Sequence, residues 1–81
     1  RYYIRLEVKD QHGTLHAISE VFDDCGISIR TMNQSILGEN SCELTFVTHT
    51  ARESNVQQAL NKIAQLDCLE SIGTLIRIEE N

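Results

Sequence analysis

The chain has 81 residues, seven basic and twelve acidic, for a net charge of −5. Its length suits one small domain, and no apolar run approaches the roughly 20 residues that span a bilayer. The basic residues are scattered rather than clustered, which disfavours a nucleic-acid partner because neutralising phosphates dominates that kind of binding.

The first quarter of the sequence predicts a strand followed by a helix. Residues 2–8 alternate apolar and polar side chains, which is typical of a half-buried strand with Tyr2, Ile4, Leu6 and Val8 inward. Residues 14–25 place apolar side chains three and four apart, at Leu15, Ile18, Phe22 and Cys25, as an amphipathic helix does. Gly26 follows as the expected C-terminal cap.

A hairpin is predicted next. Residues 27–37 form the second strand. In a regular strand Ile27 and Ile29 would lie on one face, and Met32, Gln34 and Ile36 on the other. One regular strand cannot bury both sets, so we expect a bulge near residues 30–31. Residues 38–41 form the turn. Residues 42–48 form the third strand, with Cys42, Leu44 and Phe46 inward and Glu43, Thr45 and Val47 outward.

The last part of the chain predicts a second helix and a fourth strand. Thr50 and Glu53 have the spacing of a capping box. The helix that it opens buries Val56, Ala59, Leu60 and Ile63 and ends near Leu66. The final strand lies within residues 69–79, with Ile76 and Ile78 inward. The order βαββαβ predicts an α+β, ferredoxin-like sandwich. We expect a four-stranded antiparallel sheet with both helices on one face, strands one and three central, and strand two at an edge.

No catalytic or metal motif is present. His12 and His16 lie four apart without an evident third ligand, and His49 is expected at the surface. Cys25, Cys42 and Cys68 form no C-x-x-C pair, so we expect reduced, buried thiols in a cytoplasmic protein. The sequence therefore predicts no catalytic residue, no metal and no cofactor in this domain.

The segment Asp10-Gln11-His12-Gly13 leads directly into the first predicted helix. A helix N-terminus attracts a carboxylate through its free backbone N–H groups. Asp10, at the mouth of the same loop, is suited to an ammonium group. The loop thus has both halves of a receptor for a free amino acid, although Asp10 capping a turn and Gly13 permitting a tight corner remain the simpler alternative.

Residues 2–15 together with Asp24-Cys25-Gly26-Ile27-Ser28-Ile29 resemble the ACT domain, in which the first strand leads into D-x-P-G-x-L and the first helix into G-[IV]-[NS]-[IV]. Further positions resemble the C-terminal ACT domain of homoserine dehydrogenase. They are Arg5, Leu6, Gln34, Val47-Thr48-His49, Ala59-Leu60, Ile63, Leu66 and the ending Ile76-Arg77-Ile78-Glu79. The sequence departs from the family at His12, where proline is usual, and at Met32-Asn33, where two aliphatic residues are frequent.

The resemblance implies that residues 1–81 are one regulatory domain, cut from the C-terminus of a longer enzyme, and not a catalyst. It further implies an effector site at a dimer interface formed through edge strand two. One subunit supplies Asp10, Gln11, His12, Gly13, Thr14 and Leu15, and its partner supplies Ser28 and Ile29. Asn33 and Gln34, on the edge strand, are placed to read a side-chain hydroxyl, although polar edge-strand residues that face water remain the simpler alternative.

For homoserine dehydrogenase the implied effector is L-threonine, a feedback inhibitor of a separate NAD(P)-dependent catalytic domain. Two alternatives stay open. The chain is an ACT domain of another amino-acid enzyme, or it is a module that serves only for dimerisation. A small ferredoxin-like enzyme or RNA binder is disfavoured, because the central strands lack an aromatic–basic pair and no phosphate loop is present.

Overall fold

The computed structural model describes residues 1–78. Its elements, in chain order, are β1 (Tyr2–Lys9), α1 (Thr14–Asp24), β2 (Ile29–Ile36), β3 (Ser41–Thr48), α2 (Glu53–Ile63) and β4 (Leu69–Arg77). The expected extension of the last strand to Glu79 lies outside the described residues. The order βαββαβ is the one that the sequence predicts.

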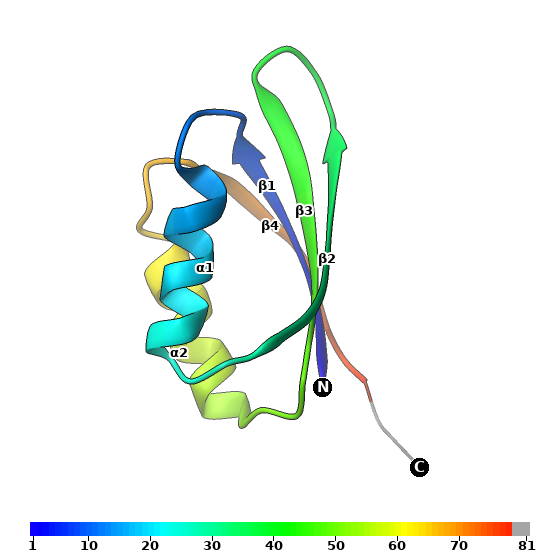
Figure 1. Ribbon diagram of the computed structural model, residues 1–81, viewed down its shortest axis with the longest axis vertical. Coiled ribbons are helices and arrows are strands. Elements are labelled where there is room, and N and C mark those ends of the chain that lie inside the picture. Colours follow the sequence, from blue (N-terminus) through cyan, green and yellow to red (C-terminus); the bar gives the residue numbers. More distant parts are fainter. Residues whose placement is uncertain (79–81) are drawn as a thin grey trace.

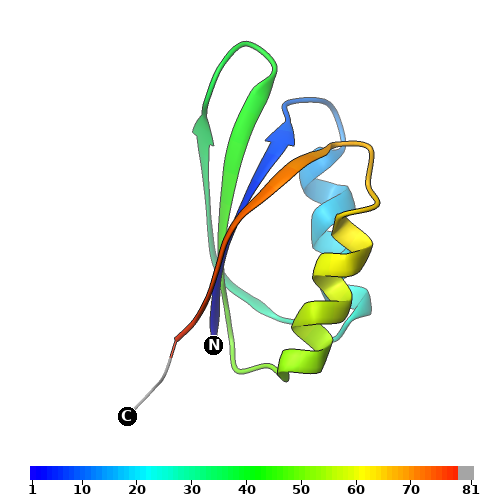
Figure 2. The same cartoon turned by 180° about the vertical axis from the view of Figure 1, so that it is seen from behind.

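The four strands form one antiparallel sheet in the order β2-β3-β1-β4. Both helices cover the same face of the sheet and leave the other face open, as the two opposite views show (Figure 1, Figure 2). The predicted fold class is therefore confirmed, including the central position of β1 and β3 and the edge position of β2.

The core lies between the sheet and the two helices. Phe22 of α1 meets Phe46 of β3 edge-to-face, with 5.1 Å between ring centroids, a geometry that the ring quadrupoles favour. The predicted inward residues of β1 and β3 are all buried. Thr48 is buried as well, and its hydroxyl accepts a hydrogen bond from the Tyr2 backbone N–H at 3.0 Å. That bond fixes the start of β1 against the end of β3.

The predicted irregularity in β2 is confirmed. The pairing of β2 with β3 shifts register between Ile29 and Thr31, so the residues that follow change faces. Beyond the shift, Met32, Gln34 and Ile36 pair with Phe46, Leu44 and Cys42 on the helix-covered face. Because neighbouring side chains of a strand point to opposite faces, Asn33 lies on the open face beside Thr45.

The end of α1 matches its prediction. Gly26 has φ +72°, a left-handed conformation that costs glycine little. The Ile27 N–H donates to the Phe22 carbonyl at 2.9 Å, and the Gly26 N–H donates to Asp23 at 3.0 Å. This pair of bonds is the Schellman motif. It directs the chain from α1 towards the edge of the sheet.

Two predictions for α2 were wrong. The predicted capping box is absent, because the helix begins at Glu53 with Arg52 as its N-cap and has no side-chain cap. Thr50 precedes that cap by two residues and is out of place for capping. The helix ends at Ile63 rather than near Leu66. The backbone amides of Gln65 and Leu66 bond only three residues back, so the chain there forms tight turns.

Inward positions were assigned wrongly in two further elements. Leu15 is 37% exposed, because α1 turns Thr14, Ile18 and Phe22 towards the sheet instead. Ile76 is 50% exposed and pairs with Tyr3, whereas Leu75 packs on the core. The register shifts between β1 and β4 displace the simple alternation that the prediction assumed. Ile78 is half-buried and lies just beyond the end of β4.

Candidate functional site

A cavity of about 330 Å³ lies where β1 ends and α1 begins. One wall is formed by the loop between β1 and α1 and by the first turn of α1. The opposite wall is formed by residues of β2 and β3 that face the helices. The lining residues are Lys9, Asp10, Gln11, His12, Gly13, Thr14, Leu15, His16, Gln34, Cys42 and Leu44. Six of the predicted site residues, Asp10 through Leu15, thus lie together, and Gln34 joins them from β2.

The start of α1 presents unoccupied hydrogen-bond donors. Its N-cap, Gly13, has φ +84°, and the helix has no side-chain cap and no acidic residue in its first turn. Within residues 1–78 the first-turn amides of Leu15 and His16 have no acceptor, whereas the Ala17 N–H reaches the Gly13 carbonyl at 2.9 Å. Such free N–H groups carry the positive end of the helix dipole. The wall therefore favours an anion.

The connection before α1 is held by its own backbone. The Asp10 N–H donates to the Asn40 carbonyl at 2.8 Å, and the Gln11 N–H donates to Lys9 at 3.0 Å. The Thr14 hydroxyl also donates to the Lys9 carbonyl, at 3.0 Å. Thr14 therefore serves to tie the loop to β1, and the Thr14 N–H is already engaged with the Gln11 carbonyl at 3.3 Å.

The Asp10 carboxylate is exposed and makes no hydrogen bond or ion pair in the described part of the chain. Its backbone N–H, by contrast, is bonded to the β2–β3 hairpin. A turn-capping carboxylate would accept a nearby backbone N–H. The side chain of Asp10 instead lines the cavity with its charge uncompensated.

The wall from the sheet combines polar and apolar groups. Gln34 pairs with Leu44, and Ile36 with Cys42. Burial raises the pKa of the Cys42 thiol, and the negative charges of Asp10 and Glu70 add to this, whereas a hydrogen bond from the Gln34 amide opposes it. The thiol is therefore neutral at physiological pH. The sequence analysis did not name Cys42 or Leu44 as site residues. It did predict that both face inward, close to the predicted turn, and that pattern could have indicated them.

Three predicted site residues do not line this cavity. Asn33 lies on the open face of the sheet. Ser28 and Ile29 lie where β2 begins, at the other end of the sheet from the connection between β1 and α1 (Figure 1). There the Ser28 carbonyl accepts the His49 N–H at 2.9 Å, and Ile29 pairs with Thr48. The contribution of Ser28 and Ile29 from a partner subunit remains a prediction.

The histidines at the cavity belong to its rim. His12 and His16 both line it, and His16 Nε2 lies 3.5 Å from Glu20 Oε2, one helical turn away on α1. Across residues 1–78 no group of three or more histidine, cysteine or acidic side chains is placed to hold a metal ion. The three cysteines are free and buried.

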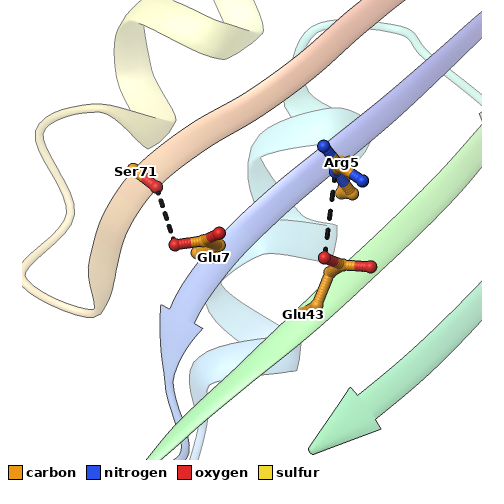
Figure 3. Close-up of polar contacts among 4 residues, drawn as sticks. All are labelled: Arg5, Glu7, Glu43 and Ser71. Atoms are coloured by element: carbon orange, nitrogen blue, oxygen red, sulfur yellow. Dashed lines mark hydrogen bonds and ion pairs between the residues drawn. The ribbon is translucent and has the colours of Figure 1, made fainter. Parts of the chain in front are cut away.

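At the centre of the open face two polar pairs join neighbouring strands, and half-buried Tyr3 pairs with Val47 on one side and with Ile76 on the other. Arg5 Nε lies 3.8 Å from Glu43 Oε2, and the Ser71 hydroxyl donates to Glu7 at 3.1 Å, each pair bridging neighbouring strands (Figure 3). Exposed ion pairs of this kind contribute little to stability. The cavity at the start of α1 is thus the stronger candidate site.

Comparison with known proteins decides the family. Residues 2–68 match the family described as the ACT domain. The chain belongs to the ACT domain family. Homoserine dehydrogenase of Neisseria gonorrhoeae is 33% identical over 79 residues, which cover 96% of this chain and 18% of that protein. This ACT domain is therefore a regulatory domain whose relatives are homoserine dehydrogenases, and it spans about a fifth of their length.

Solved structures agree with this assignment. The homoserine dehydrogenase from Thiobacillus denitrificans superposes with a TM-score of 0.86 at 33% identity, over 98% of this chain and 17% of that one. The ACT domain from the GTP pyrophosphokinase of Chlorobium tepidum shares the fold, with a TM-score of 0.60 at 18% identity over 95% of each chain. Neither described helix of this domain is long and apolar enough to cross a membrane.

Proposed function

We propose that this ACT domain senses L-threonine and transmits feedback inhibition to a homoserine dehydrogenase. The observation that carries the proposal is that a partial positive charge, at the uncapped start of α1, and a negative charge, on Asp10, line the same cavity. The uncapped first turn of α1 faces the same space as the unpaired Asp10 carboxylate. A free amino acid has the complementary carboxylate and ammonium groups on one carbon atom.

The proposed binding geometry follows from the lining residues. The effector carboxylate accepts from the Leu15 and His16 amides, and its ammonium group donates to Asp10. Hydrogen bonds between ionised groups are the stronger kind. The side chain then faces the sheet wall, where the Gln34 amide is available to a hydroxyl. This interpretation places Gln34, rather than Asn33, as the residue that reads the effector's side chain.

A second copy would complete the site through the free edge of β2. Pairing two eight-residue β2 strands antiparallel about their midpoint sets Ile29 of one copy opposite Ile36 of the other. This places the partner's Ser28 and Ile29 beside the hairpin end of the sheet, where the cavity lies. Ile36 and Leu37 at that end are 78% and 51% exposed, which supports a partner there.

The proposed parent enzyme operates in the cytoplasm.

Isothermal titration with threonine, isoleucine, methionine and lysine tests the proposal. Threonine is expected to bind, and Asp10→Asn is expected to weaken it by about 1.5–3 kcal/mol, the scale of a hydrogen bond to a charged group. Asp23→Asn, the same change on an exposed residue at the far end of α1, serves as the control.

The alternatives give different results in the same titration. Tighter binding of another amino acid would assign the domain to a different enzyme. Heat from none of them would leave a dimerisation module. In the parent enzyme, threonine is expected to inhibit homoserine oxidation. Asp10→Asn is expected to raise the inhibitory concentration of threonine by the factor by which it weakens threonine binding. Unaltered inhibition would place the effector elsewhere.

A further inference from the structure

Cys42 lies at the bottom of the cavity, on the wall that the proposed effector would meet last. Cys42 is only 2% exposed, and Leu44, two residues further along β3, is 1% exposed, yet both line the cavity. They are alternate residues of β3, so they share the helix-facing side of the strand. The depth and the chemistry of this end of the cavity are therefore set by β3.

The thiol is the polar group of that floor. Gln34 lies diagonally across from Cys42 in the β2–β3 pairing, and its amide is near enough to the sulfur to oppose the rise in the pKa of the thiol. A thiol is a weak donor and a weak acceptor in a small volume. Leu44 beside it contributes only apolar surface. An effector side chain that reaches the floor thus meets hydrogen-bonding groups, from Gln34 and Cys42, on one side and the apolar surface of Leu44 on the other.

The anchor points on the other wall direct the effector's side chain to this floor. If the carboxylate and the ammonium group are held at the start of α1 and at Asp10, the remaining large substituent of Cα faces β2 and β3. The hydrogen-bonding groups of the cavity on this side are those of Gln34 and Cys42. Short side chains with a polar atom on Cβ match the floor best.

We propose that Cys42 is a specificity-determining residue, whose thiol, together with the Gln34 amide, selects amino acids bearing a short hydroxyl-containing side chain over isosteric apolar ones. This rests on the proposed function. A site built to hydrogen-bond a hydroxyl discriminates strongly against an analogue that lacks it. Threonine and valine differ in just that way at equal size.

The first test compares threonine and valine by titration against three proteins. The wild type is expected to prefer threonine. Cys42→Val is expected to reduce that preference about ten-fold, the factor given by one lost hydrogen bond, whereas Cys42→Ser retains it. Cys25→Val is the matched control, since Cys25 is also buried but lies at the opposite end of α1. Circular dichroism verifies that each variant is folded.

The second test needs no variant and stays decisive if Cys42→Val does not fold. Trypsin cleavage after arginine and lysine leaves the three cysteines on separate peptides, at residues 10–30, 31–52 and 63–77. Alkylation by iodoacetamide, followed by mass spectrometry, therefore reports each thiol separately. Because Cys42 is buried and its thiol is neutral, the reaction is run for hours at alkaline pH, and threonine is expected to slow the modification of Cys42 more than that of Cys25.

The outcomes separate the two proposals. If no amino acid binds the wild type, the proposed function itself fails. If threonine binds but Cys42→Val keeps the full preference over valine, the selection role of Cys42 is refuted while sensing stands. Threonine binding without protection of Cys42 from alkylation would likewise overturn the role of this floor.

Discussion

Gly13 determines how the first turn of α1 meets the cavity. It is the N-cap of the helix with φ +84°, and a Cβ added there would meet nothing within 4 Å. The cost of a side chain at this position is therefore confined to the backbone. The residue needs to be glycine because of its conformation and not because of crowding.

Gly13→Ala is expected to lower the free energy of unfolding by about 1–2 kcal/mol, the cost of placing an L-residue in the left-handed region. Urea denaturation measures the change. Gly38→Ala is the control, since its surroundings are equally open and its φ lies outside that region. Equal losses for both variants would show that Gly13 carries no special conformational demand.

Single residues also mark how far the site could be predicted. The residues from Asp10 to Leu15 were predictable, because a polar loop leading into a helix has the same local chemistry in any fold. Cys42 and Leu44 were predicted to face inward but were not named as site residues, because no local pattern shows that this end of β3 lies against the loop before α1. Asn33 and Gln34 are adjacent in sequence but point to opposite faces, so strand geometry alone excludes one of them.

At the scale of elements, the alternation in β1 and β3 and the spacing in α1 predicted the fold, because burial imposes those periods. The ends of elements were harder. Thr50 and Glu53 have the spacing of a capping box, but the chain bends at residues 49–50, and Arg52, which is still extended, takes the N-cap position. In β4 the shifts of register against β1 changed which residues face inward, and no local pattern announces such a shift.

The uncapped start of α2 gives a test at this scale. Arg52→Asp is expected to stabilise the domain by about 1 kcal/mol, because an N-cap carboxylate accepts a free first-turn N–H and suits the helix dipole. Thermal unfolding measures the gain, and Thr50→Ala is expected to leave α2 intact. A loss of about 1 kcal/mol on Thr50→Ala, without a gain from Arg52→Asp, would mean that the helix begins where the capping box suggested.

For the whole molecule, the free edge of β2 is the feature that connects the proposed sensing to the proposed assembly. The two edge strands each expose an isoleucine, Ile36 on β2 at 78% and Ile76 on β4 at 50%. In the proposed assembly only the first of them lies against a second copy. The remaining site residues, Ser28 and Ile29, would reach the cavity through this pairing.

Ile36→Glu is expected to convert a dimer into a monomer in sedimentation equilibrium, because the charge would be buried against the second copy. Ile76→Glu is the control on the opposite edge and is expected to stay dimeric. Neither change touches the described core, so thermal stability of the monomer is retained. Dissociation by Ile76→Glu but not by Ile36→Glu would move the interface to β4.

The central claim is that a free amino acid binds between the start of α1 and the β2–β3 wall. At 9.2 kDa the domain is well suited to ¹H–¹⁵N correlation spectroscopy during titration with L-threonine. The largest shifts are expected for the Leu15 and His16 backbone amides and for the Gln34 side-chain amide. Saturating shifts confined to the open face, around Asn33 and Thr45, or no shifts at all at millimolar threonine, would contradict the proposed site.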